Sequence, residues 1–292
     1  MKGLYFFVFL CAFSSPSFAK TIVDVTQTQV QVPEYPKRVV TLAPSLGELA
    51  ADLVGADLER IVGVSEYTDY PPGLKKVPSV GPYTRFSLEK VMSLKPDLVL
   101  ATSDGNSKEQ VAHLRELGLP VIVVRTENFK EIEESIRLVA SALDAASLGD
   151  RRISQLRSGL QKFRSRAKSH KPFKVLLQVG DQPLFVAGKL SFLQDTLETI
   201  GSVNVYGDKE AAYPRPSVED VLHRNPDLIV VIALGRELKT YREMAQRWHQ
   251  FPQLEAVKKH RVYVLRNDAI VRPTLRILEG LSHLEKMIYG KT

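Results

Sequence analysis

Two stretches of the chain share one pattern of hydrophobic and polar positions. Residues 87–101 read SLEKVMSLKPDLVLA, and residues 217–231 read SVEDVLHRNPDLIVV. In each stretch a serine suited to cap a helix precedes apolar residues at helical spacing, and a proline ends the helix. The unbroken apolar run that follows Asp-Leu is typical of a strand buried on both faces of a parallel sheet. One helix–strand unit in each half predicts two similar α/β lobes.

The same pattern analysis predicts the other elements. In the first half we expect one or two edge strands within 21–32, strands at 38–42, 61–64 and 121–124, a helix capped by Ser45, and a helix at 109–117. In the second half we expect strands at 174–179 and 262–265, a loop at 180–189, and helices at 192–201, 241–248 and 275–289. Residues 129–143 and 148–167 have helical spacing, and no glycine-, serine- or proline-rich linker separates the halves. The sequence therefore predicts an α/β protein with two Rossmann-like lobes joined by one long helix.

The N-terminus has the features of an export signal. Lys2 gives a positive start, residues 4–13 are apolar, and Ser17-Phe18-Ala19 fits the small-x-small cleavage pattern. We predict a signal peptide at 1–19, an N-terminal lobe at 20–127, connecting helices at 128–171 and a C-terminal lobe at 172–292. The apolar run is too short to span a bilayer. The one cysteine of the chain is Cys11, so the exported protein is expected to fold without disulfides.

The formal net charge of +7 does not point to nucleic acid. The densest basic region, 151–171, has its apolar residues at helical spacing, so its charges are expected on the solvated face of a helix. No nucleic-acid-binding motif accompanies them.

No motif for catalysis or cofactor binding is present. The chain has no GxGxxG, no complete P-loop and no GxSxG, and its six histidines are scattered without metal-ligand spacing. We therefore expect no catalytic residues, no metal and no cofactor, and a binding protein rather than an enzyme.

Candidate ligand-binding residues lie in loops after the predicted strands. Ligands of open α/β sheets bind beyond the carboxyl ends of the strands. There the two halves supply aromatic and charged side chains, namely Tyr67, Tyr83, Phe185, Tyr213, Asp268 and Arg272. We expect a cleft between the lobes that receives a flat or bulky ligand. The alternative is that each tyrosine only anchors its own loop.

The repeated helices carry Glu89 and Glu219 at their second position. A carboxylate in the first turn of a helix interacts favourably with the helix dipole and needs no further role. Its presence at the same position in both lobes suggests a function that uses both lobes at once.

Four motifs resemble a known family: RVVTLAPS at 38–45, GVSEYTDYPP at 63–72, the unit at 87–101, and NDAIVRPTLR at 267–276. They look like the class III substrate-binding proteins of ABC importers, whose lobes are joined by one long helix, and most closely like the cobalamin-binding members. The similarity runs from about Lys37 to the C-terminus.

The resemblance implies a function for each candidate residue. Tyr67, Tyr83, Phe185 and Tyr213 would contact the ligand, Asp268 and Arg272 would reach its amide-bearing edge, and Glu89 and Glu219 would pair with arginines of two membrane permease subunits. It implies a monomeric periplasmic protein that captures cobalamin or a related corrinoid, without a cofactor of its own, and delivers it to the importer.

Three positions depart from the cobalamin-binding pattern. Tyr83, Tyr213 and Thr102 each stand where those proteins have a tryptophan. A ferric siderophore or haem is therefore the alternative ligand, and Tyr67, Tyr83 or Tyr213 could serve as the axial group for haem. An exported enzyme or a structural adaptor protein is the alternative from another class.

Overall fold

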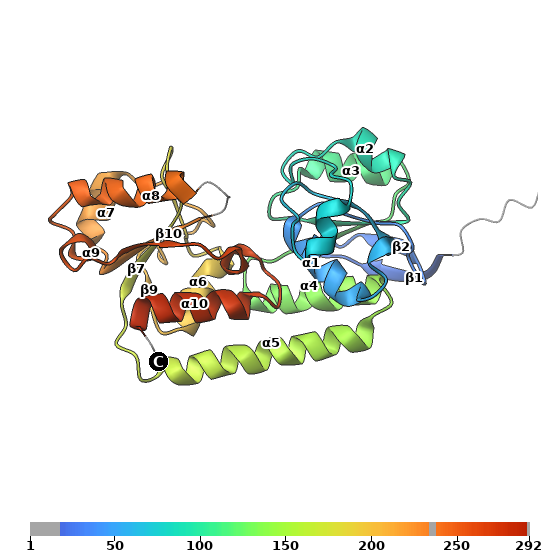
Figure 1. Cartoon of the computed structure of the whole chain (residues 1–292). Coiled ribbons are helices and arrows are strands. Elements are labelled where there is room, and N and C mark those ends of the chain that lie inside the picture. The colour runs from blue at the N-terminus through green and yellow to red at the C-terminus, as the bar shows by residue number, and fades with distance from the viewer. Residues whose placement is uncertain (1–17, 234–237, 291–292) are drawn as a thin grey trace, which may run out of the picture.

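The computed structural model of the chain describes residues 18–233 and 238–290. Two sheets built mainly of parallel strands form two lobes, and helix α5 (Ala146–Ala167) runs beside both of them (Figure 1). This confirms the predicted two-lobed α/β fold. The predicted signal peptide lies outside the described residues, except for positions 18 and 19, which begin strand β1.

The sheet of the N-terminal lobe has the order β4-β3-β5-β6, and all its strands are parallel. Every position of β3, β5 and β6 is buried, as expected for strands covered on both faces. The strands are β3 (Val39–Thr41), β4 (Ile61–Val64), β5 (Leu98–Thr102) and β6 (Val121–Val124). Helices α1 (Pro44–Val54), α2 (Leu88–Ser93) and α3 (Lys108–Glu116) connect them, with short 3-10 turns at Leu58–Arg60 and Pro72–Lys76. The predicted edge strands form a separate antiparallel pair, β1 (Phe18–Val23) and β2 (Gln29–Pro33).

The sheet of the C-terminal lobe has the order β11-β10-β7-β8, and β9 pairs with the other end of β7. Its strands are β7 (Lys174–Gly180), β8 (Phe185–Val186), β9 (Val203–Asn204), β10 (Leu228–Ile232) and β11 (Val262–Leu265). Its helices are α6 (Phe192–Thr199), α7 (Val218–Arg224), α8 (Leu238–Arg247), α9 (Glu255–Lys258) and α10 (Ile277–Tyr289), with 3-10 turns at Trp248–Gln250 and at η4 (Asp268–Val271). The segment expected to be only a loop, 180–189, contains β8, which runs antiparallel to β7.

Serine caps begin both repeated helices, as predicted. The Ser87 hydroxyl accepts a hydrogen bond from the Lys90 backbone N–H, and the Ser217 hydroxyl accepts one from Asp220 N–H, each at 3.2 Å. The prediction that Ser45 caps α1 is wrong. That helix begins at Pro44, two residues before the start that a Ser45 cap would give, because Pro44 has no N–H to satisfy and suits the first helical position.

The aspartate of each repeated unit holds the neighbouring strand. The Asp97 carboxylate accepts hydrogen bonds from the backbone N–H groups of Lys37 and Arg38, both at 2.8 Å, just before β3. In the other lobe Asp227 accepts one from Lys174 N–H, at 2.8 Å, at the start of β7. The repeated Pro-Asp-Leu thus sets the register between two central strands in each lobe.

Helix α5 joins the two lobes through packed contacts. One apolar core runs through both lobes, and α5 contributes Ile153, Leu156, Leu160 and Phe163 to it. Its glycines permit close approach. A Cβ on Gly149 would come within 2.5 Å of Ala140 in α4 (Phe129–Ala142), and one on Gly159 would come within 2.5 Å of Leu278 in α10. A helix packed along one face, and not a flexible linker, therefore connects the lobes.

Candidate ligand-binding site

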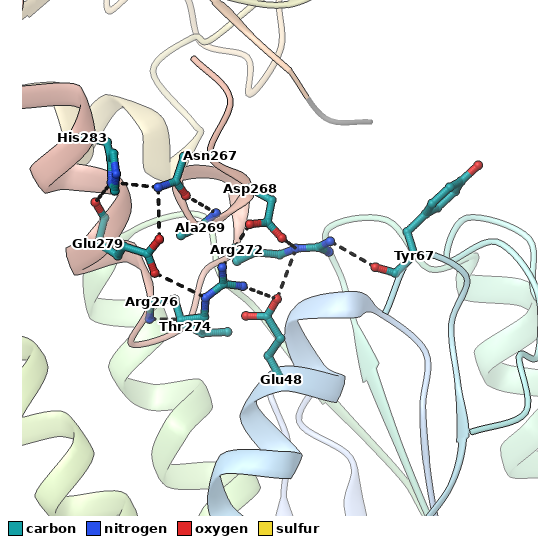
Figure 2. Close-up of polar contacts among 10 residues, drawn as sticks. All are labelled: Glu48, Tyr67, Asn267, Asp268, Ala269, Arg272, Thr274, Arg276, Glu279 and His283. Carbon is teal, nitrogen blue, oxygen red and sulfur yellow. Dashed lines mark hydrogen bonds and ion pairs between the residues drawn. The ribbon is translucent and has the colours of Figure 1, made fainter. Parts of the chain in front are cut away.

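Tyr67 follows β4 and is exposed at the border between the lobes. The residue is 71% exposed, and Figure 2 shows its ring pointing away from the charged side chains nearby. Its φ of 65° lies in the left-handed region, which a bulky side chain rarely adopts and which costs free energy. Its carbonyl oxygen accepts a hydrogen bond of 3.2 Å from Arg272 Nη2 of the other lobe. A costly backbone conformation that presents an exposed ring is a feature of functional sites.

Tyr83 is held by the residues that follow β5. Its carbonyl accepts a hydrogen bond from the Asn106 side chain, which also donates to Leu42 O at 2.9 Å. The side-chain oxygen of Asn106, Oδ1, accepts one from Thr102 N–H at 2.8 Å. The Tyr83 ring lies against Gly105, where a Cβ would come within 2.0 Å of the ring. The end of β5 thus fixes this tyrosine.

Tyr213 of the C-terminal lobe lies close to the N-terminal lobe. Burial, with smaller contributions from the nearby Tyr83 and Asp104, raises the pKa of its phenol to about 12. The residue is nevertheless 43% exposed. The two observations are compatible when a side chain has protein on most sides but still contacts solvent, as in a cleft. Tyr83 and Tyr213 are therefore near enough for one to affect the pKa of the other across the lobes.

Phe185 is half-buried at the edge of its sheet. Residues 212–214 run alongside β8, because Val186 N–H donates to Pro214 O at 3.2 Å and Gly188 N–H donates to Ala212 O at 2.9 Å. This pairing places Tyr213 next to the strand that carries Phe185. The guanidinium of Arg215 lies 4.5 Å from the centre of the Phe185 ring.

The predicted polar pair, Asp268 and Arg272, takes part in a charged cluster that links the lobes. We call Glu48, Asp268, Arg272 and Arg276 the interlobe ion-pair cluster (Figure 2). Glu48 lies in α1 of the N-terminal lobe and is only 5% exposed. Its Oε1 lies 3.0 Å from Arg276 Nη1 and 3.4 Å from Arg272 Nε, both of the C-terminal lobe.

The C-terminal side of this cluster is also well connected. Arg276 Nη2 donates to Asp268 Oδ1 at 3.0 Å, and its guanidinium lies 3.9 Å from the centre of the Tyr70 ring. The Asn267 side chain caps η4 by accepting from Ala269 N–H at 2.9 Å, which fixes the start of the segment. Arg272 and Asp268 therefore both have partners within the protein.

Burial dominates the electrostatics of Glu48. It raises the pKa of this carboxyl to about 7, although Arg276 and Arg272 act in the opposite direction. Glu48 Oε2 and the Nε atoms of both arginines have no hydrogen-bond partner within the described part of the chain. Sequence analysis missed Glu48 and Arg276 as site residues. A glutamate on the apolar face of α1 was the available signal, because a buried carboxylate needs a partner.

The comparisons with known proteins agree with this architecture. Residues 39–269 match the family described as periplasmic binding protein. The chain belongs to the periplasmic binding protein family. Among its relatives, a vitamin B12-binding protein of Vibrio cholerae is 29% identical over 271 residues, which is 91% of this chain and 94% of the relative. An ABC transporter substrate-binding lipoprotein of Bacillus subtilis is 32% identical over 282 residues, 94% of this chain and 87% of that protein.

Solved structures of the family include binders of different ligands. The periplasmic vitamin B12-binding protein of Vibrio cholerae superposes with a TM-score of 0.75 at 28% identity, covering 87% of this chain and 96% of that chain. A periplasmic heme-binding protein of Roseiflexus sp. RS-1 superposes with a TM-score of 0.77 at 25% identity, covering 87% and 98%. Members of this family carry solutes without transforming them, so this periplasmic binding protein is not an enzyme.

Other places on this binding protein are weaker candidates for a site. No group of three or more His, Cys, Asp and Glu among the described residues could hold a metal ion. No helix within 18–233 and 238–290 is both long and apolar enough to cross a membrane. A depression of about 480 Å³ on the C-terminal lobe is lined by Gln194, Asn204 and Arg224, among others, and by none of the predicted ligand residues. The Arg224 guanidinium of this depression already pairs with Asp208, with Nη1 2.8 Å from Oδ1.

Glu89 and Glu219 differ from the glutamate of the ion-pair cluster, which is buried. Both are exposed at the second position of their helices, α2 and α7. The Glu219 pKa is lowered by its own backbone N–H and by the Ser217 hydroxyl. In Figure 1 both helices lie on the side of the lobes away from α5. Two exposed carboxylates, one per lobe, are therefore available to an external partner.

Proposed function

We propose that this periplasmic binding protein captures cobalamin or a related corrinoid between its lobes and delivers it to an ABC importer. The observation that carries the proposal is the set of exposed tyrosines, Tyr67, Tyr83 and Tyr213, which come from both lobes. Tyr67 lies at the border between the lobes, where its carbonyl accepts a hydrogen bond from Arg272. Aromatic faces of this kind suit a large, flat ligand. The family relationship to vitamin B12-binding proteins supports the same ligand.

Each predicted residue has a place in this proposal. Tyr67, Tyr83, Phe185 and Tyr213 contact the macrocycle, while Asp268 and Arg272 hydrogen-bond polar groups at its edge. Arg272 must then be shared between the ligand and the Tyr67 carbonyl. The protein needs no cofactor of its own.

Delivery requires a second surface. Glu89 and Glu219 dock on two permease subunits of the importer, so a monomer with two matched lobes fits a transporter with two matched halves. Exposed ion pairs contribute only about 0–1 kcal/mol each, which suits a transient complex. The signal peptide predicted at 1–19 would bring the protein to the periplasm, where relatives of this chain are found.

Calorimetric titration of the mature protein with cyanocobalamin tests the proposal. We expect saturable binding of one ligand per chain, weakened by Tyr67→Ala and by Tyr213→Ala. Nanomolar affinity corresponds to about 12 kcal/mol, so burial of the macrocycle must supply most of it. Absence of binding by the wild-type protein would remove cobalamin as the ligand.

Haem or a ferric siderophore is the second candidate ligand. Tyrosines in place of tryptophans favour it, because a phenol oxygen can ligate ferric iron, and Tyr67 is the most exposed of them. A heme-binding protein among the structural relatives supports it. Absorbance spectra separate the candidates, since haem, ferric siderophores and corrinoids absorb differently. A haem spectrum that changes in Tyr67→Phe would favour this second candidate.

A further inference from the structure

The repeat between the lobes extends further upstream than the helix–strand unit. Tyr83-Thr84-Arg85 precedes the cap of α2, and Tyr213-Pro214-Arg215 precedes the cap of α7. The spacing Tyr-x-Arg-x-Ser-x-Glu is the same in both lobes. Each tyrosine at the lobe border is therefore followed, two positions later, by an arginine.

Arg215 lies on the side of the C-terminal lobe that carries the aromatic residues. Its guanidinium lies over the Phe185 ring, 4.5 Å from the centre, and the residue is exposed. Within the described residues it forms no ion pair and donates no side-chain hydrogen bond. A guanidinium on an aromatic face is oriented by the ring while its N–H groups at the edge stay free to donate.

Arg85 occupies the equivalent position in the N-terminal lobe. It closes a turn through its backbone, with Arg85 N–H donating to Pro82 O at 3.1 Å, and it is exposed. No ion pair to its side chain exists in the part of the chain that the structure describes. Two residues of chain span at most about 7 Å, so each guanidinium can reach a group bound beside its tyrosine. Tyr83 and Tyr213 are both exposed and both belong to the proposed ligand site, so both arginines can serve one ligand bound there.

The two arginines of the interlobe ion-pair cluster differ from Arg85 and Arg215 in having carboxylate partners. Arg272 and Arg276 lie beside the carboxylates of Glu48 and Asp268, so their charge is balanced within the protein. Arg85 and Arg215 have no such balance among the described residues. An arginine with free N–H groups suits a phosphate or a carboxylate, which it can bind through two parallel hydrogen bonds.

We infer that Arg85 and Arg215 form an anion-binding subsite of the ligand site, so the ligand is a macrocycle that carries a phosphate or carboxylate group. The inference rests on the proposed function and specifies the chemistry of its ligand. In cobalamin the acidic group is the phosphodiester of the nucleotide arm. In haem it is the pair of propionate carboxylates.

Two corrinoids that differ in the acidic group test the inference. Cyanocobalamin carries the phosphodiester, and dicyanocobinamide lacks the nucleotide arm. Calorimetry with the mature wild-type protein, Arg85→Gln and Arg215→Gln is done at low and high salt, and haemin is the third ligand. At low salt we expect each variant to bind cyanocobalamin about tenfold more weakly than the wild type does. The affinity of each variant for dicyanocobinamide should equal that of the wild type. Added salt should reduce the difference between wild type and variant.

Arg151→Gln is the matched control, because Arg151 is exposed on α5 and the substitution removes the same charge. It should leave the affinity for all three ligands unchanged. Melting curves that match the wild type show that each variant is folded.

Each result has one meaning. Equal weakening of both corrinoids, or of neither, overturns the anion subsite, while wild-type binding of cyanocobalamin keeps the proposed function. If the wild type binds neither corrinoid, cobalamin is the wrong ligand and haemin decides. Haemin affinity lost in both arginine variants then supports the subsite, and haemin affinity that is unchanged or absent overturns it.

Discussion

Two sets of side chains meet at the border between the lobes, and they have opposite properties. The exposed tyrosines, Tyr67, Tyr83 and Tyr213, present apolar faces to solvent. The interlobe ion-pair cluster is largely buried, and its charges are paired with one another. The first set has the exposure of a ligand-binding surface, whereas the second has the burial and pairing of a structural contact.

The difference indicates that ligand contact and lobe position depend on different residues. One hydrogen bond connects the two sets, from Arg272 Nη2 to the Tyr67 carbonyl. Substitutions in the cluster should therefore change stability first and ligand affinity only through this bond. Substitutions of the tyrosines should do the reverse.

Removing the central carboxylate should have the largest effect on stability. Glu48→Ala leaves two partly buried arginines without their shared partner, so we expect a loss of about 3–5 kcal/mol in the free energy of unfolding. Urea unfolding of the mature protein measures it. Asp52→Ala is the matched control, because Asp52 lies one turn further along α1 and pairs with Arg152 of α5 through two bonds of 2.7 Å. That pair is more exposed, and its loss should cost less than about 1 kcal/mol. Equal losses would contradict the special role of the cluster.

The pH dependence of stability should come next in size. Because the pKa of Glu48 is raised to about 7 in the folded protein, the folded state binds a proton more tightly than the unfolded state. Stability is then highest below the unfolded pKa and is lost as the pH rises through 7. Between pH 5 and 8 this amounts to about 2–3 kcal/mol. Glu48→Gln should remove this part of the slope. Asp195 and Glu131 also have raised pKa values, so the difference between wild type and variant is the quantity to compare.

Sequence patterns predicted the framework of both sets but not the pairing inside the cluster. Apolar runs gave β6 and β11 their observed bounds, and helical spacing located α5 to within two residues of its start. Strands β8 and β9 were missed, since two-residue strands depend on a partner strand and carry no period of their own. The Glu48–Arg276 contact joins residues 228 positions apart, which no local pattern reports.

The candidate site could be predicted only in part, because local patterns do not report contacts between distant residues. Tyr67 and Arg272 were named because they lie in loops after predicted strands, and the motifs that resemble a family added their roles. Their hydrogen bond was not predicted, because it depends on how the two lobes meet. Arg215 was overlooked although the repeat contains it, since its position over Phe185 follows from the pairing of 212–214 with β8.

Tyr67→Gly should separate stability from ligand binding. Glycine adopts the left-handed conformation freely, so the variant should keep its stability or gain up to about 1 kcal/mol. The aromatic contact is lost, so cyanocobalamin affinity should fall at least about tenfold. Urea unfolding and calorimetry give the two values on one sample. A variant that loses stability and keeps its affinity would reverse the assignment of Tyr67 to the ligand site.

The smallest effects on the isolated protein are expected at the exposed glutamates. Glu89→Ala with Glu219→Ala removes one exposed carboxylate from the first turn of α2 and one from the first turn of α7. Ligand affinity should not change, whereas ligand uptake by cells that express the importer should be lost. Glu109→Ala is the matched control, because Glu109 follows a serine cap at the same position of α3 and is equally exposed. All three substitutions remove the same dipole interaction and should lower the melting temperature by similar small amounts. Loss of uptake in the Glu109 variant as well would mean that first-turn carboxylates matter only for the helices, and the docking assignment would then fail.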